Sequence, residues 1–215
     1  MRVDPAAIGH HIASGFMRKG IKPVTDAMKM VGPAYTVRCP ERDSSALYYA
    51  LQKAPGGSVI VVDCGSDDTF ACCGEFLAMM AMHRNMAGIV VDGPATDKVA
   101  LTAMGFPVFC DGFSPVTSNV TGTSGEVGVP VVCGGAVVNP GDIILGDADG
   151  VIIVPEDYEP GLKSAEEYVD NEAARRKAIL EQGYRYVQRE DYDPVAFFEA
   201  DVAAKIAQLK KPEGK

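Results

Sequence analysis

Two acidic residues of the sequence, Glu75 and Asp97, stand where they could bind a cation together. Glu75 follows Gly74 at the start of a helical pattern, and Asp97 ends the turn 92–97 (DGPATD). Carboxylate oxygens are the ligands that a hard cation such as Mg²⁺ prefers. We therefore predict that Glu75 and Asp97 bind a divalent metal ion, directly or through its waters. The residues alone leave open a structural alternative, in which Asp97 only caps the helix that follows it.

The start of the helix at Gly74 predicts a second kind of binding. Backbone N–H groups of a first helical turn have no partner within the helix, and the helix dipole places positive charge there. A carboxylate or a phosphate is stabilised at such a position. Gly74 has no side chain, so a ligand can approach its backbone closely. We expect a bound anion at this point.

Short apolar runs alternate with helical patterns over the first half of the chain. We predict strands over residues 32–38, 58–63, 88–92 and 107–110. We predict helices over residues 5–18, 44–53 (capped by Asp43 or Ser44), 75–85 and 98–104. This alternation favours parallel strands joined by right-handed crossovers, and such sheets bind ligands beyond the carboxyl ends of their strands. Both candidate loops follow strand ends of this kind.

A different pattern begins at Val129. Three strand-like runs, VPVVCGGAVV, DIILGD and GVIIVP, are separated by the turns 139–141 (NPG) and 147–150 (DADG). Proline and glycine at these places mark tight turns, so this part should be antiparallel or mixed sheet. Two further helices are predicted, over residues 156–182 and 193–209.

The composition indicates a globular protein of 215 residues with a net charge of −9. Nucleic-acid binding is disfavoured because it depends on clustered cations, and the basic residues here are scattered. No apolar run reaches the roughly 20 residues that span a bilayer. The first residues also lack the apolar stretch of a signal peptide. We therefore expect a cytoplasmic protein that binds neither nucleic acid nor a membrane.

The cysteines do not predict a metal site. The six are Cys39, Cys64, Cys72, Cys73, Cys110 and Cys133, and no two of them form a CxxC pair. Zinc sites need ligands clustered at short spacings. We expect reduced core residues, with Cys72 and Cys73 as the pair near the predicted site; whether that pair does more than pack stays open.

Taken together, the blocks of sequence resemble the RraA-like family. These blocks are VGPAYTVRCP, GGSVIVVDCG, GEFLA, GIVVDGPATD, GFPVFCDGFSP and VPVVCGGAVVNPGDIILGDADGVIIVP, and the similarity covers roughly residues 30–182. The family contains 4-hydroxy-4-methyl-2-oxoglutarate / 4-carboxy-4-hydroxy-2-oxoadipate aldolases and the regulator of ribonuclease E activity A. The resemblance implies one α/β/α layered domain of the swivelling phosphohistidine type over residues 1–215. Its core would cover 30–155, with a C-terminal helical extension over 156–210 and assembly as a homotrimer or hexamer.

The resemblance also implies a reaction: a divalent-metal-dependent lyase, either an aldolase or a decarboxylase, acting on a small 2-oxo acid through a metal-stabilised enolate. Mg²⁺ or Mn²⁺ would be the cofactor, held by Asp97, Glu75 and Glu172, the last from a neighbouring subunit. Glu75 and Asp97 match the family's catalytic acids. The substrate-binding positions that match are Gly74, Glu75, Phe76, Leu77 and Thr96.

One position departs from the aldolase pattern, which has Arg-Asp where this chain has Thr96-Asp97. Arginine presents a charged, planar fork to a carboxylate, whereas threonine presents one hydroxyl. Neither Lys98 nor Arg84 is expected to replace it, because Lys98 should project elsewhere and Arg84 lies far along the helix. A smaller or less anionic substrate is therefore expected. The alternative is a non-catalytic regulatory or protein-binding member of the family.

Overall fold

The computed structural model describes residues 5–9, 14–65 and 68–154. All of them lie in one compact unit, Met1–Asp170. The predicted helices over 156–182 and 193–209 lie outside the described residues, and so does Glu172. A single domain over residues 1–215, with a core over 30–155, stays a prediction.

The described residues form a mixed sheet with the order β1-β5-β4-β3-β2-β9-β10, in which β6 also pairs with β2. A separate two-stranded sheet consists of β7 and β8. The strands are β1 Lys22–Pro23, β2 Met30–Arg38, β3 Val59–Asp63, β4 Gly88–Asp92, β5 Val108–Cys110, β6 Glu126–Val127, β7 Val131–Cys133, β8 Ala136–Val138, β9 Ile143–Asp147 and β10 Gly150–Val154.

Four neighbouring strands, β2 to β5, are parallel, as predicted. Their apolar runs are nearly continuous because both faces are covered: Val59, Ile60, Val61 and Val62 are all buried. Alternate residues of β3 therefore enter two different apolar clusters, one beside the helices and one on the opposite face.

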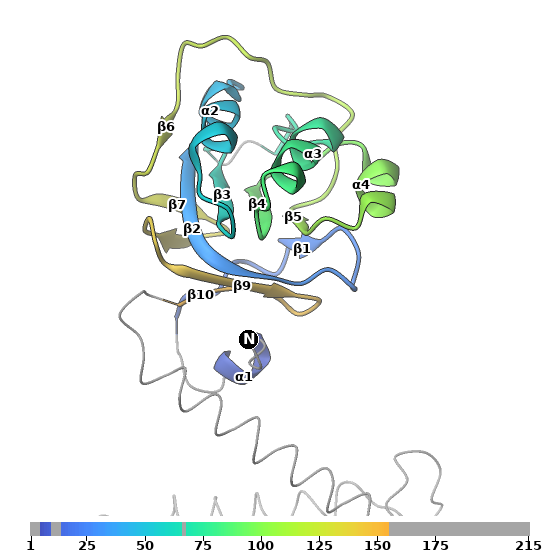
Figure 1. The fold of residues 1–215 in the computed structure, drawn as a ribbon, viewed down its shortest axis with the longest axis vertical. Coiled ribbons are helices and arrows are strands. Elements are labelled where there is room, and N and C mark those ends of the chain that lie inside the picture. Colours follow the sequence, from blue (N-terminus) through green and yellow to red (C-terminus); the bar gives the residue numbers. More distant parts are fainter. Residues whose placement is uncertain (1–4, 10–13, 66–67, 155–215) are drawn as a thin grey trace, which may run out of the picture. The chain divides into compact units, whose positions relative to one another are not determined.

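The helices of the described residues are α1 Pro5–Gly9, α2 Ser45–Lys53, α3 Glu75–His83 and α4 Lys98–Met104. Figure 1 shows α2, α3 and α4 together on one side of the parallel strands. The predicted helix over 5–18 is wrong from residue 14 onward. Gly15 has φ of 87°, a left-handed conformation that a helix does not contain, and Phe16 forms a β-bridge with Ile152.

The sheet curls until it is nearly closed. The first half of β2 pairs with β9 and the second half with β3, so β2 belongs to both parts of the sheet. At the far end β1 contacts β9 and β10, and Lys22 Nζ donates to the carbonyl oxygen of Asp149 at 2.7 Å. Phe109, fully buried, lies in the apolar cluster that this curvature encloses.

The hairpin β7–β8 covers the face of β3 and β4 that faces away from the helices, with Val131, Cys133 and Val138 in the enclosed cluster. The predicted single strand over 129–138 is therefore wrong. Gly134 and Gly135 have φ of 58° and 79°, and this pair of left-handed residues makes a two-residue hairpin turn. The predicted hairpin at 147–150 is confirmed, since β9 and β10 pair there.

The expected fold class is thus confirmed as α/β with a mixed sheet. The expected α/β/α layering differs, because strands and a hairpin cover the second face of β3 and β4. No helix among the described residues has the length and apolar character that crossing a membrane requires.

Asp43 ties the start of α2 to residues 121–124. Ser44 occupies the N-cap position of α2 without a side-chain capping bond, and it is an Asp43 carboxylate oxygen that accepts the hydroxyl and N–H of Ser45 at 2.5 and 2.9 Å. The other oxygen accepts the Thr121 hydroxyl at 2.6 Å and the N–H groups of Thr123 and Ser124 at 2.9 and 3.0 Å. These hydrogen bonds, first those from the side chains of Ser45 and Thr121, lower the pKa of Asp43 well below its usual range.

We predict a pH-dependent stability effect at this residue. The native pKa of Asp43 lies below its unfolded value of about 3.9, so the stabilisation is complete above that pH and is lost as the pH falls toward the native pKa. Asp43→Asn should therefore lower Tm at pH 7. The Tm difference between the variant and wild type should become smaller as the pH falls below about 4. Thermal unfolding followed by circular dichroism at several pH values measures it. A difference that stays constant with pH would contradict the assignment.

Candidate functional site

Residues 113–119, which follow β5, run along the carboxyl ends of the parallel strands and form a segment that we term the strand-end belt. Parallel β-bridges join Phe113 to Ala95, Thr117 to Ala71 and Asn119 to Asp43. The loops after β2, β3 and β4 are thereby paired through their backbones, as a continuation of the sheet. Side chains on these loops consequently have well-defined positions.

Within this frame Asp97 contacts the start of α3. Its Oδ2 accepts the backbone N–H of Glu75 at 3.0 Å. The two predicted site residues, 22 positions apart in sequence, are therefore neighbours. Asp97 is exposed and lies in the left-handed region, with φ of 57° and ψ of 41°. That conformation is uncommon for a residue other than glycine, although aspartate adopts it more readily than most residues do.

The alternative that Asp97 only caps α4 is correct for its position but not for its hydrogen bonds. Asp97 occupies the N-cap position of α4, but its side chain makes no capping hydrogen bond to that helix. It accepts instead from the first residue of α3, a different helix. Asp97 thus joins two strand-end loops, a role that capping of α4 alone does not explain.

Gly74 is required at this contact because of space. A Cβ on Gly74 would lie 2.5 Å from Asp97 Oδ2 and 2.6 Å from Thr96 Cγ2. The backbone of Gly74 is extended, with φ of −146°, so its conformation alone would accept any residue. Thr96 is half-buried, and its N–H donates to the Cys73 carbonyl oxygen at 2.9 Å. Gly74, Thr96 and Asp97 are in direct contact.

The other predicted substrate-binding residues lie in the first turn of α3. Glu75 and Phe76 are exposed, whereas the Leu77 side chain is buried in the apolar cluster beside the helices. Only the backbone N–H of Leu77 is placed to face a ligand. Because the Glu75 N–H already donates to Asp97, the first turn offers the N–H groups of Phe76 and Leu77 to an anion.

Arg84 and Lys98 are the two basic residues that were considered as replacements for the missing arginine. Arg84, at the opposite end of α3, donates through Nη1 to the Gln52 carbonyl oxygen at 2.9 Å. The Lys98 ammonium lies 5.2 Å from the ring centroid of Phe113. Neither therefore replaces the arginine that the aldolase pattern has at position 96.

Glu75 and Asp97 are the two predicted metal ligands that fall within residues 5–9, 14–65 and 68–154. In this part of the chain no group of three or more His, Cys, Asp or Glu side chains is arranged to hold a metal ion. The third predicted ligand, Glu172, is outside it. The described residues thus offer two carboxylates.

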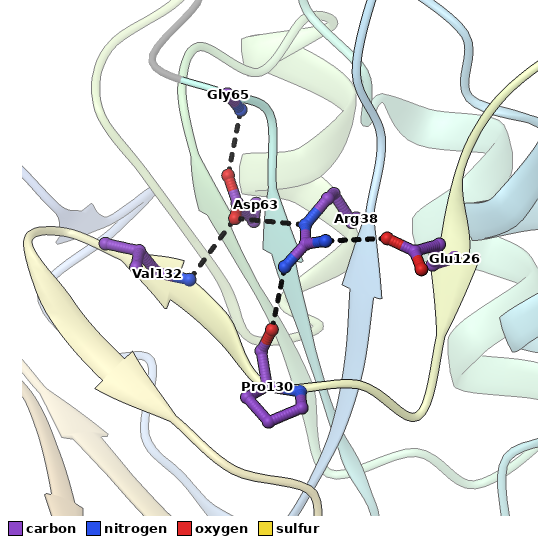
Figure 2. A network of polar contacts seen from close by, with 6 residues as sticks. All are labelled: Arg38, Asp63, Gly65, Glu126, Pro130 and Val132. Carbon is purple, nitrogen blue, oxygen red and sulfur yellow. Dashed lines mark hydrogen bonds and ion pairs between the residues drawn. The ribbon is translucent and has the colours of Figure 1, made fainter.

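A second set of charged residues lies at the ends of β2, β3 and β4, on the face of the sheet that faces away from the helices. This set was not predicted. Asp63 ends β3 and pairs in register with Arg38 and with Asp92, so all three side chains point to the same face. Asp63 accepts the N–H groups of Gly65 and Val132 at 2.8 and 3.2 Å (Figure 2).

Arg38 links β2 to the segment that contains β6 and β7. It donates to Glu126 at 2.6 Å and to the Pro130 carbonyl oxygen at 2.9 Å, and its Nε lies 3.9 Å from Asp63 (Figure 2). These contacts hold the β7–β8 hairpin against the strand ends. We interpret this set as structural.

Arg18 forms ion pairs with Asp92, the last residue of β4, and with Asp111. It lies 2.5 Å from the buried Asp92 and 2.8 Å from Asp111 as ion pairs. The signal for Asp63 and Asp92 is visible in the sequence, since VIVVD and GIVVD both end in aspartate. Arg18 gives no such signal because it precedes Asp111 by 93 residues.

Comparisons with known proteins identify relatives in sequence and in fold. A sequence model of the RraA-like family, described as Aldolase/RraA, matches residues 7–153. The chain is 41% identical over 160 residues to a protein of Halalkalibacterium halodurans named "Putative 4-hydroxy-4-methyl-2-oxoglutarate aldolase". That match covers 74% of this chain and 76% of the relative.

Two solved structures extend the similarity to the fold. RraAS2 of Streptomyces coelicolor, described as an unusual member of the RNase ES inhibitor RraA protein family, has a TM-score of 0.65 and 28% identity, covering 86% of this chain and 93% of the other. A protein of Geobacillus kaustophilus described as an S-adenosylmethionine: 2-dimethylmenaquinone methyltransferase has a TM-score of 0.61 and 29% identity, covering 66% and 88%.

We predict that Gly74→Ala disrupts the contact between the two loops. The added methyl group would meet Asp97 Oδ2 at 2.5 Å, and such overpacking costs about 1–3 kcal/mol of unfolding free energy. Gly56→Ala is the matched control, because the nearest atom to its added methyl group would be 3.4 Å away. Urea unfolding of both variants measures the difference. Equal stability of Gly74→Ala and wild type would contradict the close contact.

Proposed function

We propose a function for this chain from one premise: the chain belongs to the RraA-like family. The family includes proteins named as aldolases and as RraA inhibitors. Our proposal is a divalent-metal-dependent lyase, of the aldolase or decarboxylase kind, that acts on a small 2-oxo acid. The observation that supports it is the hydrogen bond from the Glu75 backbone N–H to Asp97 Oδ2, which brings the Asp97 carboxylate to the first turn of α3, where Glu75 also lies.

The two carboxylates fit the needs of Mg²⁺ or Mn²⁺. Mg²⁺ keeps several waters and is commonly bound through one or two carboxylates together with the substrate. Asp97 uses Oδ2 to accept the Glu75 N–H, and its exposed side chain leaves Oδ1 for a cation. Glu75 is exposed on the same turn. In this proposal Glu172 of a neighbouring subunit is a third ligand.

Charge balance supports a cation at this place. A 2-oxo acid is an anion, and Glu75 and Asp97 repel it although the helix start attracts it. Glu75 and Asp97 would hold a divalent cation, which would balance their charge and supply Lewis-acid stabilisation of negative charge on the substrate. The chain's own part is to orient the substrate carboxylate with the N–H groups of Phe76 and Leu77.

Thr96 favours a substrate with fewer negative charges than an aldolase of the usual pattern takes. Its single hydroxyl replaces an arginine fork, and Arg84 and Lys98 are engaged elsewhere.

The methyltransferase name of the Geobacillus relative is not favoured, because the sequence has no GxGxxG motif that opens a helix after a strand.

A regulatory function is the second candidate, and the similarity to RraAS2 over 93% of that chain favours it. This function would not need a bound metal. A complex with a ribonuclease of the RNase ES type, unaffected by Asp97→Asn, would support it.

A homotrimer is part of the proposal. Several large apolar side chains are exposed on the helical face: Tyr49, Phe76, Met79, Met82 and Val99. In the proposed assembly these side chains would be buried between subunits. Light scattering of the full chain should therefore give three or six times the mass of 22.7 kDa, and a monomer mass would contradict the assembly.

We predict that Asp97→Asn abolishes metal-dependent turnover while the fold persists. Asparagine tolerates the left-handed conformation and can still accept the Glu75 N–H, but it carries no charge. Pyruvate release from a panel of 2-oxo acids with Mg²⁺ or Mn²⁺ should fall about 100-fold or more. If wild type turns over no 2-oxo acid with any divalent metal, the lyase function is wrong.

We predict that Thr96→Arg gains activity toward a 2-oxo dicarboxylate such as 4-hydroxy-4-methyl-2-oxoglutarate. Loss of one oxyanion donor costs about 10²–10³-fold in turnover, so its restoration should gain on the order of 10²-fold. Thr96→Lys is the control, because it restores the charge without the planar fork and should gain less. No gain from arginine would indicate that the pocket differs in shape as well.

A further inference from the structure

Two thiols beside the proposed site take no part in the proposed function. Cys64 Sγ and Cys72 Sγ are 3.1 Å apart, and both side chains are buried. Cys64 directly follows β3, and Cys72 lies two residues before Gly74. The sequence suggested Cys72 and Cys73 as the notable pair; the structure shows that the sulfur facing Cys72 belongs to Cys64.

Cys72 is held in place by backbone hydrogen bonds of the residues on either side of it. The residue before Cys72, Ala71, donates to Val116 O at 2.8 Å and accepts from Ser118 N–H at 2.9 Å, both in the strand-end belt. The residue after it, Cys73, accepts from Thr96 N–H at 2.9 Å. A disulfide bond is about 2.05 Å long, so the sulfurs need to approach by only about 1 Å.

The pair lines a small pocket near the surface. Its lining residues are Cys39, Arg42, Asp43, Cys64, Phe70, Cys72 and Ser118. Arg42, Phe70 and Ser118 are half-buried, so the pocket reaches the surface at their side chains. The Arg42 guanidinium lies 4.1 Å from the centroid of the Phe70 ring, and its Nε donates to the Thr117 carbonyl oxygen at 3.0 Å.

We propose that Cys64 and Cys72, whose sulfurs are 3.1 Å apart, are a redox-active pair that forms a disulfide by reaction with a small peroxide. Each thiol gives up its proton, and the peroxide accepts two electrons. With hydrogen peroxide the O–O bond breaks, the S–S bond forms and two water molecules leave. The bond ties the end of β3 to the segment that leads into Gly74. This proposal does not depend on the lyase function.

The pair is expected to react slowly and specifically. The hydrogen bond with Cys64, together with burial, raises the pKa of the Cys72 thiol, so little thiolate is present at neutral pH. Oxidation should therefore take minutes to hours. Cys73 is the adjacent thiol, but its sulfur lies 4.0 Å from the Gly74 carbonyl oxygen, outside the group that lines the pocket.

The test is a thiol count on the full-length protein after treatment with hydrogen peroxide. Remaining thiols are alkylated in denaturant and counted by mass spectrometry. We expect six alkylated cysteines before treatment and four after it, with six again after dithiothreitol. Cleavage at Asp67 or Asp68 separates Cys64 from Cys72 and Cys73, and fragment-ion sequencing of the disulfide-linked peptides shows which of these two adjacent residues is alkylated and which is bonded.

Variants assign the two sulfurs. Cys64→Ser and Cys72→Ser should each leave five alkylated cysteines with or without peroxide, whereas the matched control Cys73→Ser should go from five to three. Six unchanged thiols in oxidised wild type, or a bond to Cys39 or Cys73, would overturn the proposal. The peptide map of wild type decides the question even if a variant does not fold.

Discussion

Backbone pairing beyond the ends of the strands is the constraint on which the rest of the site depends. The strand-end belt, residues 113–119, bridges to the loops after β4, β3 and β2 in turn. Loops of this kind are ordinarily the most variable part of an α/β protein. Here their backbone groups are satisfied as in a sheet, and a hydrogen bond from the Thr96 N–H to the Cys73 carbonyl oxygen keeps Gly74 beside Asp97.

The chemistry of the site follows from how closely the loops approach. Asp97 reaches the start of α3 only because Gly74 has no Cβ, and it does so in a left-handed conformation. A carboxylate at that point competes with any anionic ligand for the positive end of the helix dipole. The competition is relieved if a cation lies between the carboxylates and the ligand, which is why we favour a metal-dependent reaction over a simple anion site.

Sequence reasoning succeeded where local pattern determines structure. The bounds of β4 and α4 agree with the prediction, and β3 and α2 differ by one residue at one end. Sequence reasoning failed where the structure depends on a pair of glycines or on a contact with a residue far away in the sequence. Gly134 and Gly135 fold a predicted strand into a hairpin, and two-residue strands such as β1 and β6 carry too little pattern to be found. Glu75 and Asp97 were paired correctly, but the ion pair of Arg18 with Asp92 depends on tertiary packing, as does the contact of Cys64 with Cys72.

The central claim is that Asp97 helps to bind a divalent cation beside the start of α3. Mn²⁺ binding to the full chain, followed by electron paramagnetic resonance, measures this without assuming a substrate. The account predicts one bound Mn²⁺ per chain in wild type and affinity at least about 10-fold weaker in Asp97→Asn. Equal Mn²⁺ affinity in the two proteins, or no specific binding in wild type, would contradict it.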